Sequence, residues 1–77
     1  MSSWTFETFE TQYKNNPNWH IYGEYRWEKS GGFSTFVGVF NEKGMQISTI
    51  FENIYGTKEQ AKRSFKRQIA KLRKEQL

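Results

Sequence analysis

The segment TKEQAKRSFKRQIAKLRKE, residues 57–75, carries the clearest structural signal in the chain. It begins with a capping box, in which the Thr57 hydroxyl accepts a free N–H at the helix start and the Gln60 side chain reaches back to another. Four apolar residues then recur at spacings of four, four and three: Ala61, Phe65, Ile69 and Leu72. Because a helix has 3.6 residues per turn, this spacing predicts an amphipathic helix that buries one apolar stripe.

Positive charge is concentrated in the same part of the chain. Residues 58–77 hold eight of the twelve cations against two glutamates, a net charge of +6: Lys58, Lys62, Arg63, Lys66, Arg67, Lys71, Arg73 and Lys74, opposed by Glu59 and Glu75. The other 57 residues hold four cations and six glutamates, a net charge of −2. Like charges repel at i,i+4 spacing, as at Arg63 and Arg67, and a bound anion would relieve that repulsion. The asymmetry indicates a polyanionic or acidic partner, with a merely solvated helix face as the alternative.

Three segments before the helix have the patterns of β-strands. Apolar and polar side chains alternate over residues 18–29, residues 33–40 are apolar on both faces, and a third strand is expected over residues 45–55. Short turns at residues 30–32 and 41–44 join them. Since consecutive strands joined by short turns pair antiparallel, the sequence predicts an α+β fold in which a three-stranded antiparallel meander packs on the C-terminal amphipathic helix.

The N-terminal segment, residues 1–16, fits two structures. Phe6, Phe9 and Tyr13 would share one face of a helix, whereas Trp4 and Phe6 alone suit a strand. We predict a short helix, and we expect it to stop at Asn15-Asn16-Pro17, because the residue before a proline is pushed out of the helical region. Three hydroxyl residues are its candidate caps: Ser2, Ser3 and Thr5. If this segment does not dock on the sheet, its rings form an exposed patch that favours dimerisation or a partner.

Composition excludes several classes of function. The chain of 77 residues is expected to form one domain, and it has no cysteine, no aspartate and a single histidine, His20. Metal sites and Ser-His-Asp or Cys-His catalytic sets need those residue types, so we expect no metal, no cofactor and no enzymatic activity. His20 is interpreted as an ordinary surface histidine, with a contact in a binding face as the alternative.

The hydropathy and the first residues of the sequence indicate where in the cell the protein is expected. The mean hydropathy is −0.92, and no apolar run approaches the ~20 residues that a membrane span needs. The first residues lack the basic and apolar regions of a secretory signal. The sequence therefore predicts a cytoplasmic protein without a membrane partner.

A second candidate surface lies on the polar face of the first predicted strand and in the turn after it. Tyr22, Arg26 and Lys29 combine an aromatic ring with cations, which suits base stacking or guanine-edge contact. The same residue types are enriched in protein–protein hot spots, and simple cross-strand packing is a further alternative. The aromatic residues of opposite parity are predicted to lie in the core: Trp19, Tyr25 and Trp27.

The order of three strands followed by a capped helix that starts Thr57-Lys-Glu-Gln-Ala61 resembles AP2-type DNA-binding domains and the arm-type-binding domains of phage and transposon integrases. The likeness covers about residues 18–74. It implies that the sheet face away from the helix enters the DNA major groove, with contacts from Tyr22, Arg26 and Lys29. Glu24 and Glu28 depart from that pattern, because carboxylates on the same face disfavour phosphate. The phosphate-facing cations then lie mainly on the helix.

These observations predict a non-catalytic module that binds nucleic acid, DNA above all, as a monomer or homodimer. Its candidate contact residues are Tyr22, Arg26, Lys29, Lys62, Arg63, Lys66, Arg67, Lys71, Arg73 and Lys74. The chain also looks like small accessory proteins of phages and mobile elements. That likeness implies an alternative function as an anti-CRISPR-like inhibitor of a host protein that handles nucleic acid. A self-assembling component is a third possibility, and it would need an exposed apolar strand edge.

Overall fold

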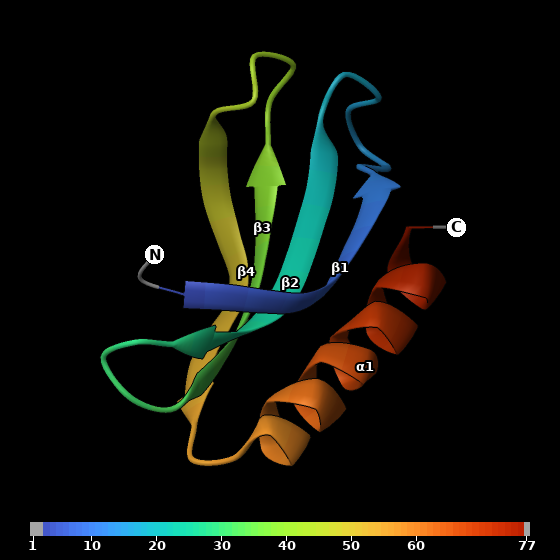
Figure 1. The fold of residues 1–77 in the computed structure, drawn as a ribbon. Helices are drawn as coiled ribbons and strands as arrows, with labels where there is room; N and C mark the ends of the chain where they lie inside the picture. The colour runs from blue at the N-terminus through green and yellow to red at the C-terminus, as the bar shows by residue number, and fades with distance from the viewer. Residues whose placement is uncertain (1–2, 77) are drawn as a thin grey trace.

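The computed structural model describes residues 3–76, which form one antiparallel sheet of four strands and one helix (Figure 1). The elements in chain order are β1 (Ser3–Gln12), β2 (His20–Glu28), β3 (Phe33–Phe40), β4 (Gln46–Tyr55) and α1 (Lys58–Glu75). Each strand pairs with the next one along the chain, so the sheet is a meander with β1 and β4 at its edges. The helix α1 lies across one face of this sheet (Figure 1). No described element covers the other face.

The predicted N-terminal helix is wrong, because Ser3–Gln12 forms β1 and pairs antiparallel with β2. Phe6 and Phe9 are three residues apart, which is the spacing of a helix face, but a bulge produces the same spacing in a strand. The register shifts between Thr5 and Glu7, so Phe6 is an extra residue and both phenylalanines reach the side of the sheet that α1 covers. The predicted three-stranded sheet is thus a four-stranded one. Ser2, one of the candidate helix caps, lies outside the described residues.

Two further features favour a strand at the N-terminus. Threonine recurs in this segment, at Thr5, Thr8 and Thr11, and its β-branched side chain lowers helix propensity and suits a sheet. With β1 in place, β2 has a hydrogen-bonded neighbour on each side, β1 and β3. Without β1, the edge of β2 would be left unpaired.

The core lies between the sheet and α1. The predicted apolar stripe of the helix is confirmed as buried: Ala61, Phe65, Ile69 and Leu72. Phe65 is fully buried, and the centre of its ring lies 5.1 Å from that of Tyr25. Gly23 relieves crowding beside this contact, since a Cβ at that position would stand only 3.3 Å from the Val37 side chain. The helix therefore packs closely on the middle of β2.

Polar contacts fix α1 at several points along its length. Thr57 is its N-cap, and the threonine hydroxyl accepts the Gln60 N–H at 3.2 Å. The buried Thr35 hydroxyl donates to the Ala61 carbonyl at 2.7 Å, which ties β3 to the first turns. At the other end, the Lys14 N–H donates to the side chain of the residue that caps the helix C-terminus, at 2.6 Å. The helix thus crosses the sheet in one defined position.

The remaining core predictions have mixed outcomes. Tyr25 is buried, and Trp19 is half-buried against Tyr13, with ring centres 5.8 Å apart. The prediction for Trp27 is wrong: it is 41% exposed and pairs with the exposed Trp4 near the end of the sheet beside the β2–β3 turn. Within residues 3–76, no helix has the length and apolar character that crossing a bilayer requires.

Candidate binding surfaces on the helix and the sheet

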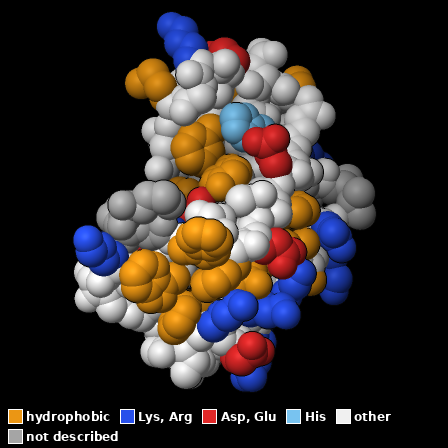
Figure 2. Space-filling view, in the orientation of Figure 1, with side chains coloured by type: hydrophobic (Ala, Val, Ile, Leu, Met, Phe, Trp, Pro, Cys, Tyr) orange, Lys and Arg blue, Asp and Glu red, His pale blue; other side chains and the backbone are white. Residues whose placement is uncertain are grey.

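The outer surface of α1 is cationic, and Figure 2 shows blue side chains gathered over the helix. Seven lysine and arginine side chains of α1 beyond its first turn are all exposed: Lys62, Arg63, Lys66, Arg67, Lys71, Arg73 and Lys74. The apolar stripe faces the sheet, so the 3.6-residue period turns these residues to the sides and the outside of the helix. Six of them, together with Lys58 of the first turn, form two groups that differ in their contacts with the rest of the chain, and Lys62 belongs to neither group.

The first group flanks β1 and is engaged within the molecule. The Lys66 ammonium donates to the Glu7 carboxylate at 2.8 Å. The Lys58 ammonium lies 4.4 Å from the centre of the Phe6 ring, and the Arg73 guanidinium 5.9 Å from the centre of the Phe9 ring, both within cation–π range. These cations help to hold the helix against the first strand.

The second group, here called the basic row, consists of Arg63, Arg67, Lys71 and Lys74. Among the described residues, no carboxylate lies within 4.0 Å of any of its nitrogen atoms. At a rise of 1.5 Å per residue, the row extends for about 16 Å along the helix axis. Its first two members also line a shallow hollow of about 140 Å³ between α1 and Tyr55 of β4.

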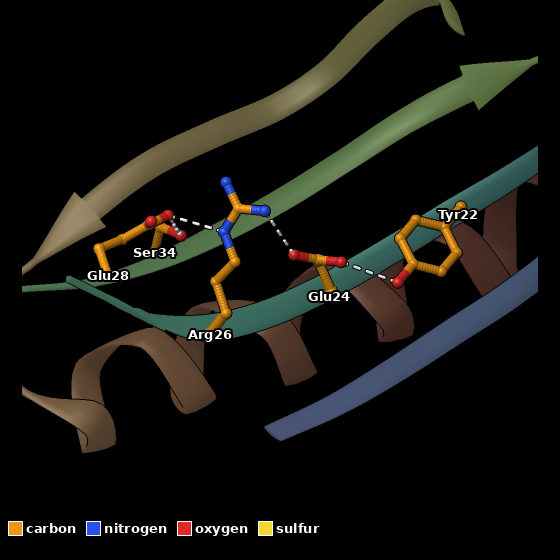
Figure 3. Close-up of polar contacts among 5 residues, drawn as sticks. All are labelled: Tyr22, Glu24, Arg26, Glu28 and Ser34. Carbon is orange, nitrogen blue, oxygen red and sulfur yellow. Dashed lines mark hydrogen bonds and ion pairs between the residues drawn. The ribbon is translucent and has the colours of Figure 1, made fainter. Parts of the chain in front are cut away.

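The second surface is the open face of the sheet, the face that α1 does not cover. In Figure 3 the helix lies behind the sheet, and four β2 residues on this face are drawn in front of it, with Ser34 of β3 beside them. The Tyr22 hydroxyl donates to Glu24 Oε1 at 2.7 Å, and Arg26 Nη1 donates to Glu24 Oε2 at 3.0 Å. Arg26 Nε donates to Glu28 Oε2 at 2.7 Å, and the Ser34 hydroxyl donates to the same oxygen at 2.8 Å. These five residues form one connected network.

The network shifts the pKa values of its members. Burial, and then the hydrogen bond to the Glu24 carboxylate, raise the pKa of Tyr22 to about 12. The hydrogen bond from Arg26 lowers the pKa of Glu28, and the same bond raises the pKa of Arg26. Tyr22 is therefore neutral and Arg26 charged at neutral pH, with the guanidinium held between two carboxylates.

The structure places the sequence-predicted residues on opposite sides of the molecule. Tyr22 and Arg26 share the open face as expected, whereas Lys29 lies in the exposed turn after β2. The basic row lies across the core from them, so the helix cations and the sheet residues do not make up one site. Since Glu24 and Glu28 engage Arg26, the guanidinium is directed to protein carboxylates rather than to a ligand.

Sequence reasoning missed two phenylalanines on the open face, Phe36 and Phe40. The edge of the Phe40 ring approaches Tyr22, with ring centres 6.0 Å apart, and the ring stacks on His20 at 5.7 Å. His20 Nε2 also lies 3.4 Å from the Glu10 carboxylate. The sequence pattern that could have identified them is the strand over residues 33–40, which is apolar on both faces. With a single helix, only one of these faces is covered.

One edge of the sheet is apolar. Four large side chains on or next to β4 are 41–66% exposed: Met45, Ile47, Ile50 and Ile54. Two bulges interrupt the pairing of β4 with β3, and Ile47 and Ile50 are the extra residues. Bulges of this kind twist an edge strand away from further pairing.

Within residues 3–76, no three potential metal ligands come together. Comparison of the chain with models of known families, with curated protein sequences and with solved structures finds no match. The two surfaces are therefore interpreted from their own residues and charges.

Proposed function

We propose that this chain is a non-catalytic module that binds the phosphate backbone of nucleic acid, DNA above all, with the basic row of α1. One observation carries the proposal: the four cations of the row are exposed and have no carboxylate partner among the described residues. Other cations of the chain, such as Lys66 and Arg26, are engaged by carboxylates. The row therefore places four exposed cations of one helix within reach of an external anion.

The physical basis of this binding is counterion release. Each phosphate neutralised by a lysine or arginine frees condensed cations from the nucleic acid, so affinity falls steeply as salt rises. Arg63, Arg67 and Lys71 are four residues apart, which spaces them about 6 Å along a rigid helix. Such a row contacts successive phosphates without reading bases.

The open face of the sheet determines how the protein is oriented when it approaches nucleic acid. It carries Glu24, Glu28 and, on the neighbouring edge strands, Glu10 and Glu52. Phosphates are repelled from this face, so the protein approaches nucleic acid with α1 first. Base contacts by Tyr22 and Arg26 are not part of the proposal, because both side chains lie on the far side of the sheet from the basic row.

The test is a salt titration of binding to fluorescent duplex and single-stranded oligonucleotides, followed by anisotropy between ~50 and 300 mM salt. Four phosphate contacts predict a slope of log K against log salt of about −3 to −4 on duplex DNA. The variant Arg67→Gln should weaken binding to all sequences alike and reduce the slope by about one. Lys43→Gln, which makes the same charge change in the exposed β3–β4 hairpin, is the matched control and should change neither.

Two outcomes would overturn the proposal. One is an absence of oligonucleotide binding at the lowest salt while polyglutamate binds, which would assign the row to an acidic protein. The other is equal behaviour of Arg67→Gln and Lys43→Gln, which would show that binding is not located on the helix.

A further inference from the structure

Phe36 lies between two carboxylates on the open face of the sheet. The strand register pairs it with Glu24 of β2 on one side and with Glu52 of β4 on the other, so the three side chains form a row across three strands. The Phe36 ring lies across Gly38, where a Cβ would stand only 2.6 Å from the ring carbon Cζ. The glycine thus lets the ring lie low over the sheet between its two acidic neighbours.

This row belongs to a shallow hollow of about 330 Å³. Two more aromatic rings line the hollow, those of Tyr22 and Phe40, together with Gln46 of β4 and with Arg26, which Glu24 and Glu28 hold. Aromatic rings attract a cation that lies over them, and carboxylates beside the rings add to the attraction. A planar guanidinium suits this combination best, because it stacks on a ring and donates two parallel hydrogen bonds to a carboxylate.

The open face of the sheet carries mostly acidic side chains, and their negative charge attracts a guanidinium. Four glutamates lie on it, Glu10, Glu24, Glu28 and Glu52, whereas Arg26 is its only lysine or arginine among the described residues and His20 lies at its rim. Glu24 and Glu28 already share Arg26, while no described cation lies within 4.0 Å of Glu52. The chain as a whole has a net charge of +4, so this negative face is a local feature of the fold.

We infer that the open face of the sheet is a docking surface for an arginine-bearing basic segment of a partner protein, with an arginine over Phe36 and paired with Glu52. Charge complementarity selects this occupant over nucleic acid, which the same carboxylates repel. The inference concerns the face opposite the basic row and does not depend on the function proposed above. Taken together, the two surfaces would let one small domain hold a polyanion on one side and a basic segment on the other.

The test uses a fluorescent hexa-arginine peptide with the full chain, followed by anisotropy at ~50 mM salt, with hexalysine for comparison. Wild type should bind hexa-arginine more tightly than hexalysine, because only arginine stacks and forms a bidentate pair. Glu52→Gln should weaken hexa-arginine binding about three- to fivefold, as expected for a partly exposed ion pair. The matched control Glu42→Gln makes the same charge change in the exposed hairpin and should leave binding unchanged.

A second variant tests the ring itself. Phe36→Leu keeps an apolar side chain over Gly38 but removes the aromatic face, and it should reduce hexa-arginine affinity about threefold while hexalysine binding changes less. Circular dichroism confirms that each variant is folded, and oligonucleotide binding, which belongs to the opposite face, should not weaken in any of them.

Three results would overturn the inference. The first is no hexa-arginine binding by wild type, and the second is equal binding by Glu52→Gln and Glu42→Gln. The third is concentration-dependent self-association, measured by sedimentation, that both Glu52→Gln and Arg67→Gln abolish. That result would make α1 of a second copy the occupant of the face in place of a partner protein.

Discussion

The outer face of α1 and the open face of the sheet differ in whether their charged side chains are paired with each other. On the sheet, two glutamates hold Arg26. Tyr22 and Ser34 donate hydrogen bonds to these glutamates and form the two ends of the network. On the helix, the basic row has one sign of charge and no carboxylate partner among the described residues. Paired charges hold a local structure, whereas unpaired charges remain available to a ligand. The difference shows why counting arginines and lysines does not locate a binding surface.

Phe65 joins the two surfaces, because its buried ring holds the helix on the sheet. We expect Phe65→Ala to destabilise the protein by about 3–5 kcal/mol, which is much of the total stability of a small domain. Urea unfolding followed by circular dichroism measures this loss, and the proposed binding of oligonucleotide and of hexa-arginine should fall together. Lys62→Ala, at an exposed position of the same helix, should change stability by at most about 0.5 kcal/mol. If Phe65→Ala left stability within 1 kcal/mol of wild type, the packing of α1 described above would be wrong.

Glu24 and Glu52 lie on either side of Phe36 but have different roles. Glu24 is 8% exposed and accepts hydrogen bonds from Tyr22 and Arg26, so Glu24→Gln should lower the free energy of unfolding by about 1–3 kcal/mol. Glu52 is exposed, and Glu52→Gln should change it by less than about 0.5 kcal/mol. Parallel urea unfolding of the two variants tests the distinction. Equal losses would contradict a structural role that belongs to Glu24 alone.

Most of the fold was accessible from the sequence, because local patterns determine it. The capping box at Thr57 and the stripe through Phe65 fixed the helix, and alternation with short turns fixed three strands. The first strand was not accessible, since the bulge at Phe6 gives a strand the residue spacing of a helix. The spacing of residues alone cannot distinguish a helix from a bulged strand. The pairing of this segment with β2 distinguishes them.

The candidate surfaces were accessible only in part, for a related reason. The basic row follows from helical periodicity, and so does the alternation that puts Arg26 on a face with Glu24 and Glu28. The row through Phe36 and Glu52 depends on cross-strand register, and two bulges in β4 shift that register. The two shifts cancel in parity, so Glu52 lies on the same side as Gln46, but its place beside Phe36 follows only from the register.

Acid should weaken the sheet network before it affects the basic row. The hydrogen bond from Arg26 lowers the pKa of Glu28, so the folded state holds the proton less tightly than the unfolded state does. The resulting stability is present above the ordinary carboxyl range and is lost as pH falls through the lowered value. Glu28→Gln should therefore cost about 1 kcal/mol at pH 7, and its difference from wild type should shrink towards pH 3. Urea unfolding at several pH values measures this, and a difference independent of pH would argue against the charged pair.

The smallest expected effect concerns Lys66, the one cation of α1 that pairs with a carboxylate among the described residues. Its ammonium and the Glu7 carboxylate lie 2.8 Å apart with 53% and 39% of the side chains exposed, so Glu7→Gln should alter stability by at most about 0.5 kcal/mol. The pair still matters for binding, because Lys66 must leave Glu7 before it can neutralise a phosphate. Lys66→Gln should consequently weaken oligonucleotide binding less than Arg67→Gln does. Glu7→Gln, which frees the ammonium, should strengthen binding and steepen the salt slope by up to about one. Equal losses for Lys66→Gln and Arg67→Gln would show that pairing within the fold does not determine which cations reach the ligand.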